Sequence, residues 1–314
     1  VRYEHAGQQH TVEAPLIVDA SGRGSLIGRW LRARGTATQE TAVDAGVLYT
    51  SCTFELPAQV ADDWKLLGVM PQMPHDPYSA ALMRVGHDRI LCAMICYGRP
   101  KAPNTPAEMV ERTRLLSVAE LYQVLQAARP VGPVHNFSNT ANRFRHYLGL
   151  PGPADRVVVI GDALCALNPR YGQGMSTAAL GAELLGEALD RWPSADLAGF
   201  ARDFRARVAR RMRQPWTMAL VEDRLWAALV DGGTPSRGQR LFAAATKRGL
   251  NAVFSDVDAY VRFMRVAHML DSPMQLLSPG FASAVLLGGL RGRGRVVEAP
   301  GVTLEDYEAG CSSA

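Results

Sequence analysis

The sequence predicts an α/β fold in which two strand–turn–helix units flank an antiparallel sheet and a helical region follows. An apolar run over 16–20 ends in a glycine turn before a helix-like stretch. Residues 43–97 hold three β-rich runs separated by Pro- and Gly-bearing turns, which is typical of an antiparallel sheet. A second buried-strand pattern over 156–161 leads into a helix predicted for 175–192.

Composition indicates an ordered protein with a large core. The chain has 314 residues, of which 47% are hydrophobic and 20% charged, so disorder is excluded as the general state. The net charge is +4, and the 34 basic residues are scattered along the chain. Scattered arginines are not the clustered footprint of a nucleic-acid-binding protein.

Cysteine usage and hydropathy point to a reduced, cytoplasmic protein. The five cysteines form neither a disulfide framework nor paired zinc-ligand spacings, so no metal site is predicted. The longest apolar run near the C-terminus, 281–290, is shorter than the ~20 residues that cross a bilayer. We therefore predict no transmembrane segment and no nucleic-acid partner.

The first residues already have a strand pattern. Residues 1–4 alternate, a turn follows at 6–8, and a second strand reaches 11–12. A domain rarely starts inside a strand, and this leads us to expect that the chain is truncated at its N-terminus.

The middle of the chain predicts strands first and then a helix. The three β runs cover 47–54, 80–85 and 89–96. Residues 105–128 have helical character and 130–147 are extended again. These elements would make up a β-sheet domain over 45–150.

The last third is predicted to be helical. In the helix over 175–192, the only polar stripe holds Glu183, Glu187, Asp190 and Arg191, so the remaining surface is expected to be covered. An apolar stripe at spacing four follows, formed by Phe200, Phe204, Val208 and Met212. Further helices are predicted for 216–230, 236–250 and 255–270. The arginines from Arg205 to Arg213 are predicted to face solvent, with an anionic surface or partner as the alternative.

The motif that carries the most chemistry is the segment from Ile160 to Met175. A buried strand ends at Gly161 and presents Asp162 at its carboxyl edge, where open α/β sheets bind ligands. A carboxylate there can accept a hydrogen bond from a sugar or polyol hydroxyl. Gly172 and Gly174 let the backbone approach a ligand closely, and the following helix start favours negative charge.

This segment resembles the Gly-Asp motif of the FAD-dependent monooxygenases that share the glutathione-reductase-type fold, such as aromatic hydroxylases, squalene epoxidase and polyether epoxidases. The resemblance implies that Asp162 binds the FAD ribityl chain and that the glycine-rich loop lies against the flavin ring. The alternative is an ordinary strand–turn–helix corner with a solvated aspartate. The cofactor-binding residues implied here are Gly161, Asp162, Pro169, Gly172, Gln173, Gly174 and Met175.

A second segment, from Ala14 to Ser25, is similar to the family's other FAD-region motif and adds Asp19 and Gly22 to the implied cofactor-binding residues. Ser21 stands where many aromatic hydroxylases have an aspartate that is tied to NAD(P)H use. The Asp-Ala-Ser-Gly form occurs in epoxidases, halogenases and isoprenoid reductases. NAD(P)H is therefore expected as the ultimate reductant, acting through a separate flavin reductase.

The same turn also imitates a Rossmann fingerprint, Gly22-x-Gly24-x-x-x-Gly28. That reading needs an acidic residue about 20 positions later, at the end of the second strand. Glu40 precedes the next strand and Glu55 ends it, so neither fits well. A true G-x-G-x-x-G does not occur in the 314 residues.

Two tyrosines are the predicted catalytic residues. Tyr49 lies in the first strand of the β region, which in this family lines the substrate pocket. Tyr171, between Pro169 and Gly172, would sit beside the flavin ring. The alternative for both is a packed, hydrogen-bonded side chain. His75 and His135 lie in Pro-flanked loops and are predicted to be solvated.

Together these features predict an FAD-binding domain over 1–44 and 151–195, the inserted antiparallel β-sheet substrate domain over 45–150 and a helical region over 196–314. The resemblance implies a monooxygenase that inserts oxygen from O2 into a hydrophobic small molecule, by epoxidation or hydroxylation, through a flavin C4a-hydroperoxide. The alternatives are a reductase of isoprenoid double bonds and a non-catalytic FAD- or partner-binding fragment. The 314 residues alone are expected to be inactive.

Overall fold

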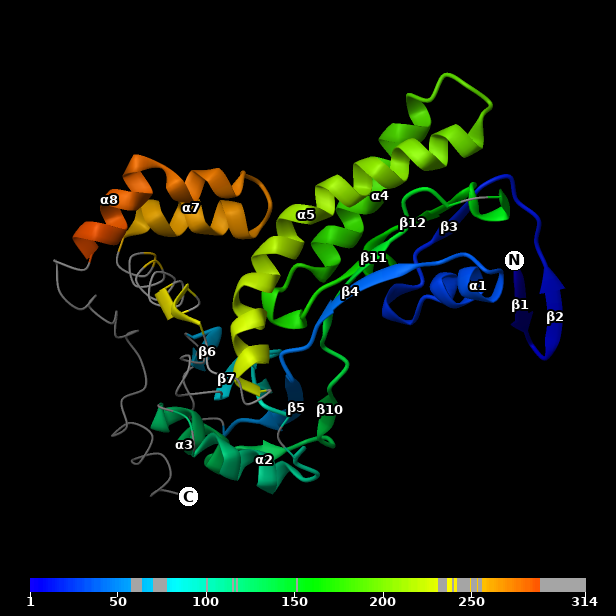
Figure 1. The fold of residues 1–314 in the computed structure, drawn as a ribbon. Coiled ribbons are helices and arrows are strands. Elements are labelled where there is room, and N and C mark those ends of the chain that lie inside the picture. The colour runs from blue at the N-terminus through cyan, green and yellow to red at the C-terminus, as the bar shows by residue number, and fades with distance from the viewer. Residues whose placement is uncertain are drawn as a thin grey trace. The chain divides into compact units, whose positions relative to one another are not determined.

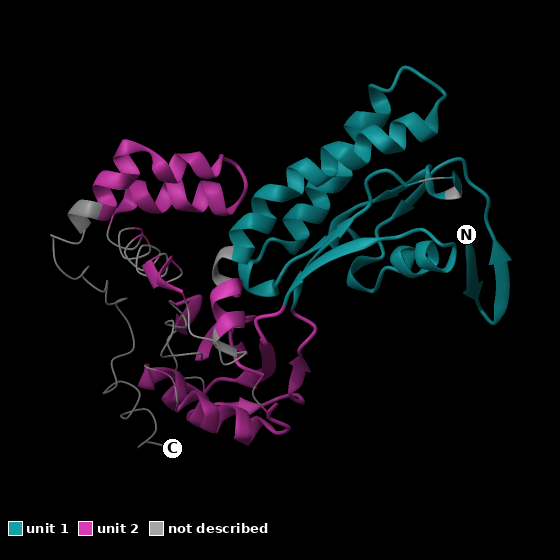
Figure 2. Cartoon of the chain, viewed as in Figure 1, with its two compact units in different colours: residues 1–43, 141–221 teal, residues 44–140, 222–314 magenta. Residues whose placement is uncertain are grey.

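The structure is a computed structural model of the whole chain (Figure 1). It describes residues 1–57, 64–69, 78–99, 101–114, 116, 118–150, 152–230, 236–238, 240–241, 249, 253 and 256–288. The chain forms two compact units, coloured separately in Figure 2. Unit 1 comprises 1–43 and 141–221, and unit 2 comprises 44–140 and 222–314.

Unit 1 contains the two strand–turn–helix segments predicted from the sequence. Its elements are β1 (Arg2–His5), β2 (Gln8–Thr11), β3 (Ile17–Asp19), η1 (Gly22–Gly24), α1 (Ile27–Ala33), β4 (Gln39–Val43), β11 (Asn142–His146), η2 (Gly152–Ala154), β12 (Val157–Val159), η3 (Gly161–Ala163), β13 (Cys165–Ala166), η4 (Pro169–Tyr171), α4 (Gly174–Asp190) and the first part of α5 (Leu197–Val230). Strands β3 and β12 pair in parallel, whereas β13, β11 and β4 form an antiparallel sheet. Strands β1 and β2 form an antiparallel hairpin.

Unit 2 is built on an antiparallel sheet in the order β10-β5-β8-β7-β6, with β9 also paired to β5. Its elements are β5 (Leu48–Glu55), β6 (Leu66–Val69), β7 (Tyr78–Arg84), β8 (Arg89–Cys96), α2 (Pro106–Thr113), α3 (Ala119–Ala127), β9 (Arg129–Pro130), β10 (His135–Phe137), α7 (Val257–Ala267), η5 (Pro273–Leu277) and α8 (Pro279–Gly288), with the last part of α5. The antiparallel sheet predicted for this region is confirmed.

The alternation of β5 explains how this sheet is stabilised. Buried and half-buried residues alternate along its whole length, because successive side chains of a strand point to opposite faces. The buried face, which includes Phe54 and Met94, packs against Leu121 of α3 and Met109 of α2. Two helices therefore cover one face of the sheet, where the sequence indicated a single helical stretch over 105–128.

The core of unit 1 forms where α5 packs against β12. The stripe of Phe200, Phe204, Val208 and Met212 is buried, as its spacing of four predicted, together with Val157 to Val159 of β12. All three residues of β12 are buried, as expected of a short strand in a parallel pair covered by helices.

Helix α5 corrects one boundary expected from the sequence. The sequence predicted a separate helix over 216–230, but one helix continues from Leu197 through Pro215 to Val230. A proline inside a helix removes one backbone hydrogen bond at a cost of about 3 kcal/mol. Met212 and Trp216, on either side of the proline, both pack on the unit 1 core, and this burial offsets the missing hydrogen bond.

Helix α4 corrects a second expectation. The surface outside its polar stripe was expected to be covered, yet Met175 is 86% exposed and Leu189 is 44% exposed. An exposed stripe at alternating spacings of four and three runs along the helix, through Met175, Ala179, Ala182, Gly186 and Leu189. Apolar character shows that a side chain tolerates burial, and it does not show that another element covers it.

The compact units do not coincide with the three predicted domains. Strand β11 groups with unit 1 because it pairs with β4 and β13, although the predicted substrate domain extended to residue 150. Division of the chain into compact units does not show which unit binds FAD or a substrate, so the assignment of FAD-binding and substrate domains stays a prediction. In the described part of the chain, no helix is long and apolar enough to span a bilayer.

The packing of α4 on the strand before Asp162 yields a prediction about two glycines. A Cβ at Gly181 would lie 3.3 Å from the Cβ of Ile160, whereas a Cβ at Gly186 would meet nothing within 4 Å. Gly181→Val should lower the free energy of unfolding by about 1–3 kcal/mol because of overpacking. Gly186→Val, the matched control, should change it by less than about 0.5 kcal/mol. Urea unfolding followed by circular dichroism checks this, and equal effects would show that α4 does not pack closely on Ile160.

Candidate functional site

The candidate site lies in unit 1, at the carboxyl ends of the parallel strands β3 and β12. Val157 is paired with Ile17, and Val159 with Asp19. Because the strands run in the same direction, the turns that follow them emerge at the same edge. These turns are η1 and η3, which contain the two sequence motifs and contact each other.

Asp19 organises the first turn. Its carboxylate accepts hydrogen bonds from the main-chain N–H of Ser21 at 2.9 Å and from the hydroxyls of Ser21 and Ser25. Gly22 has a φ of +77°, a conformation that glycine adopts without strain. The Asp19 carboxylate is thus engaged within the turn, and its contact with a cofactor stays a prediction.

Among the residues of these two turns, all of which the structure describes, Asp162 has a carboxylate that is partly open to solvent. Its side chain is 31% exposed, and its Oδ2 lies 3.6 Å from Nε of Arg23. Burial raises the pKa of Asp162 above its usual range, and the guanidinium groups of Arg23 and Arg145 act in the opposite direction. Asp162 can accept a hydrogen bond from a ligand hydroxyl on its open side.

Arg23 ties the first turn to two later segments. Its Nη1 donates to the carbonyl oxygen of Ala141 at 2.8 Å, and its Nη2 donates to that of Leu167. The side chain of Arg23 therefore connects η1 both to the start of β11 and to the loop that follows Asp162.

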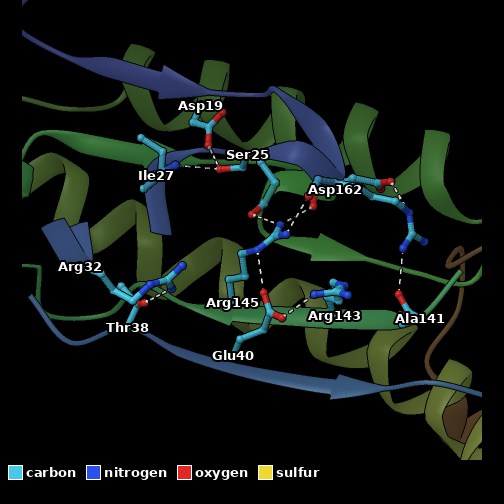
Figure 3. A network of polar contacts seen from close by, with 12 residues as sticks. Asp19, Ser25, Ile27, Arg32, Thr38, Glu40, Ala141, Arg143, Arg145 and Asp162 are labelled. Carbon is cyan, nitrogen blue, oxygen red and sulfur yellow. Dashed lines mark hydrogen bonds and ion pairs between the residues drawn. The ribbon is translucent and has the colours of Figure 1, made fainter. Parts of the chain in front are cut away.

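Arg145 joins the two motif turns through several hydrogen bonds, as Figure 3 shows. Its Nη1 donates to the carbonyl oxygens of Asp162 at 3.1 Å and Ala163 at 3.0 Å, and its Nη2 donates to that of Arg23 at 2.8 Å. Its Nε donates to Oε2 of Glu40 at 3.0 Å. Arg145 is 9% exposed, so one buried cation, neutralised by Glu40, holds both turns.

The loop before α4 is shaped by three residues. The side chain of Asn168 accepts a hydrogen bond from the N–H of Arg170 at 3.2 Å, and Pro169 starts η4. Gly172 ends η4 with a φ of +63°, which a residue with a side chain adopts only under strain. The loop is thus fixed close to Asp162: a Cβ at Gly174 would lie 3.8 Å from Oδ1 of Asp162.

The start of α4 completes the site. The helix begins at Gly174, and the preceding Gln173 provides no side-chain cap. The first N–H groups of a helix have no intrahelical partner, and they favour negative charge. The site therefore combines a carboxylate that can accept hydrogen bonds from hydroxyls, a glycine loop that permits close approach and helix N–H groups that favour an anion.

Most of the predicted site residues lie in unit 1, whereas the two predicted catalytic tyrosines belong to different units. The hydroxyl of Tyr171 donates to the carbonyl oxygen of Ala219 at 3.0 Å, and its ring packs on the unit 1 core. Tyr49 lies in unit 2, on β5, against the cluster that includes Tyr97 and Trp226. The catalytic roles of both tyrosines stay predictions. His135 is exposed on β10, and His75 lies outside the described residues.

Three charged residues of the site were missed in the sequence: Arg23, Arg145 and Glu40. Arg23 lies inside the motif from Ala14 to Ser25, in which only Asp19 and Gly22 were predicted to bind the cofactor. Arg145 belongs to the strand Asn142–His146, in which three of five residues are buried. An arginine in such a strand is a usable signal, because arginine is rarely buried without a partner.

The sequence of the chain is similar to those of known proteins. A family model described as "FAD binding domain" matches residues 1–224. Protein Rv3254 of Mycobacterium tuberculosis is 29% identical over 220 residues, which are 69% of this chain and 45% of the relative. Uncharacterized protein MJ1520 of Methanocaldococcus jannaschii is 23% identical over 202 residues, which are 63% of this chain and 46% of the relative. The chain thus spans about half the length of these curated relatives.

Solved structures share the fold. Klebsiella pneumoniae HpxO complexed with FAD and uric acid matches with a TM-score of 0.52 at 17% identity, over 92% of this chain and 66% of that chain. OxyS anhydrotetracycline hydroxylase from Streptomyces rimosus matches with a TM-score of 0.53 at 16% identity, over 84% of this chain and 47% of that chain. The α/β fold with an FAD-binding domain and antiparallel sheets, predicted from the sequence, is confirmed.

The role of Arg145 yields a prediction with a matched control on the same strand. Arg145→Met removes the cation that holds both turns and leaves three carbonyl groups without a donor, so the free energy of unfolding should fall by about 3 kcal/mol or more. Arg143 pairs with the same Glu40, at 2.9 Å, but its side chain is 37% exposed. Arg143→Met should cost less than about 1 kcal/mol. Urea unfolding of both variants decides this, and equal losses would mean that only the pairing with Glu40 matters.

Proposed function

The chain belongs to the FAD binding domain family, and from this premise we propose that it is part of an FAD-dependent monooxygenase that oxidises a hydrophobic small molecule. One observation carries the proposal: the partly open Asp162 carboxylate lies beside the glycine loop and the uncapped start of α4. An ordinary surface corner would not need two buried or half-buried arginines to fix the turns around it.

In this proposal the residues of the chain bind and orient FAD, and bound FAD supplies the redox chemistry with O2. Asp162 accepts a hydrogen bond from a hydroxyl of the ribityl chain. Gly172 and Gly174 let the main chain lie against the flavin ring, because neither places a side chain there. The N–H groups at the start of α4 stabilise negative charge on the ring.

The proposal extends the predicted roles of the remaining residues. Gly22 and Gly161 shape the turns, and Gln173 and Met175 border the ring at the start of α4. Tyr49 and Tyr171 border the substrate. An epoxidation requires no protein base, and this agrees with the site, in which Asp162 is the only partly open carboxylate of the motif turns. Phenol hydroxylation would favour a base that ionises the substrate.

A reductase of isoprenoid double bonds is the second candidate, since Ser21-Gly22 is the form that this class shares. The two are separated by following product formation in the natural protein that contains these residues, with and without O2. We include in the proposal that residues 1–314 alone are inactive. A yellow, product-forming preparation of those residues would overturn that part.

Asp162→Asn should separate cofactor binding from stability. Loss of a charge-assisted hydrogen bond to a ligand hydroxyl should weaken FAD binding by about ten- to a hundredfold, on the order of 1.5–3 kcal/mol. The pKa of Asp162 is raised in the folded chain. Its ionisation therefore opposes folding, and the stability contributed by the protonated form is lost as the pH rises through that raised pKa.

In the absence of FAD, Asp162→Asn should consequently be at least as stable as the wild type at pH 7. Its stability relative to the wild type should increase between pH 4 and pH 7. FAD titration and thermal unfolding at these pH values measure both effects. Unchanged FAD affinity in the folded variant would reduce Asp162 to a surface corner residue. If the stability of the variant relative to the wild type instead decreased from pH 4 to pH 7, the pKa of Asp162 would not be raised in the folded chain.

The reductant is the last element of the proposal. Ser21 leaves the first turn without the aspartate of the NAD(P)H-using hydroxylases, so we expect a separate flavin reductase to deliver electrons. In anaerobic stopped-flow experiments with substrate present, NADH or NADPH alone should bleach bound FAD far more slowly than turnover, commonly on the order of 10 per second. Adding a generic flavin reductase should restore bleaching. Bleaching at the turnover rate without a reductase would assign the enzyme to the single-component class.

A further inference from the structure

Unit 1 contains a cavity of about 220 Å³ that the candidate FAD site does not use. Its walls come from β11 and the residues after it, from the segment around η3, and from α5. Phe144, Leu164, Val208 and Trp216 are among the apolar residues that line it. The volume is below that of drug-sized pockets, about 300–1,000 Å³, and suits a smaller molecule.

Helix α5 gives this cavity a row of cationic and small residues. Arg205, Ala209 and Arg213 all line it, and their spacing of four places them on one helix face. The sequence indicated that Arg205 faces solvent with its neighbours, and this is wrong: Arg205 is only 4% exposed. The apolar residues of α5 pack in the core of unit 1, and the side chain of Arg205 is buried together with them.

The buried Arg205 guanidinium has no carboxylate partner in the described part of the chain. Its Nη1 donates to the carbonyl oxygens of Asp155 at 3.0 Å and Val157 at 2.8 Å. Its Nε is buried without a hydrogen-bond partner. Burial lowers the pKa of Arg205, which the neighbouring charge of Asp155 partly opposes. A buried cation held only by carbonyl groups leaves positive potential at the cavity wall.

The other polar residues that line the cavity are either basic or uncharged. His146, Arg145 and Arg213 are the remaining titratable basic residues that line the cavity, and no Asp or Glu does. Arg145 is already neutralised by Glu40. Arg213 is exposed at the rim, so an anion can reach it from solvent. An apolar cavity beside two cations is complementary to a molecule with an apolar body and one negative group.

We propose that this cavity binds a small amphipathic carboxylate, with its ring or alkyl body against Phe144, Leu164 and Trp216 and its carboxylate beside Arg213 in the field of Arg205. The site is separate from the residues assigned to FAD, and the proposal does not depend on the proposed monooxygenase activity. Its chemistry defines the ligand class, an aromatic or branched aliphatic monocarboxylate.

The probe is 4-fluorophenylacetate, titrated into the 314-residue chain and followed by fluorine NMR. Saturable binding is expected, and the neutral isostere 4-fluorophenylacetamide should bind at least tenfold more weakly. Arg213→Gln should weaken binding of the acid at least fivefold. Arg210→Gln, the matched control, removes an equal charge from an exposed position of α5 that does not line the cavity, and it should change binding less than twofold.

Ala209→Leu tests the cavity without a change of charge. The larger side chain should fill part of the space and abolish binding of the acid, while the thermal midpoint of the chain stays within a few degrees of the wild type. Absence of saturable binding to the folded wild type would overturn the proposal. So would equal affinities for acid and amide, equal effects of the Arg213 and Arg210 variants, or full binding by a folded Ala209→Leu variant.

Discussion

The parallel register of β3 and β12 is the constraint on which the candidate site depends. It sets Asp19 opposite Val159, so that the turn after each strand emerges at one edge. A slip of β12 by one residue would turn its side chains to the opposite face of the pair, and Asp162 would no longer lie 3.6 Å from Arg23. The packing of β12 on α5 therefore has a chemical consequence, because the same buried valines that form the core fix the position of the carboxylate.

Electrostatics add what the register alone does not supply. Two irregular turns brought to one edge expose carbonyl oxygens toward each other, and Arg145 satisfies three of them with one side chain. A guanidinium suits this place because its donors are fixed in a planar fork, which lysine lacks. Glu40 neutralises the cation from β4. The antiparallel strands β4 and β11 thus provide the charged side chains that hold the turns after β3 and β12, although neither strand carries a recognisable motif.

The sequence predicted those parts of the molecule that follow from local patterns. Alternation predicted β5 and β8, the spacing of four predicted the buried face of α5, and the two glycine turns pointed to the candidate site. The sequence did not predict the roles of Arg23 and Arg145, because these depend on which turns the fold brings together. It also misplaced Arg205: a helix face with several arginines usually faces solvent, and only the packing of α5 against β12 shows which of them is buried.

Pro215 gives α5 a property that a helix of 34 residues would not otherwise have. The proline has no N–H, so the carbonyl group of Arg211 receives no hydrogen bond from the next turn. The two parts of the helix on either side of Pro215 are therefore connected by fewer backbone hydrogen bonds, and side-chain packing contributes more to holding them together. In terms of hydrogen exchange, we expect the amides around the buried residues Phe204 and Val208 to be strongly protected. The segment after Pro215 has buried residues of its own, such as Ala219 and Trp226, so we expect α5 to open as two partly independent cooperative segments placed end to end.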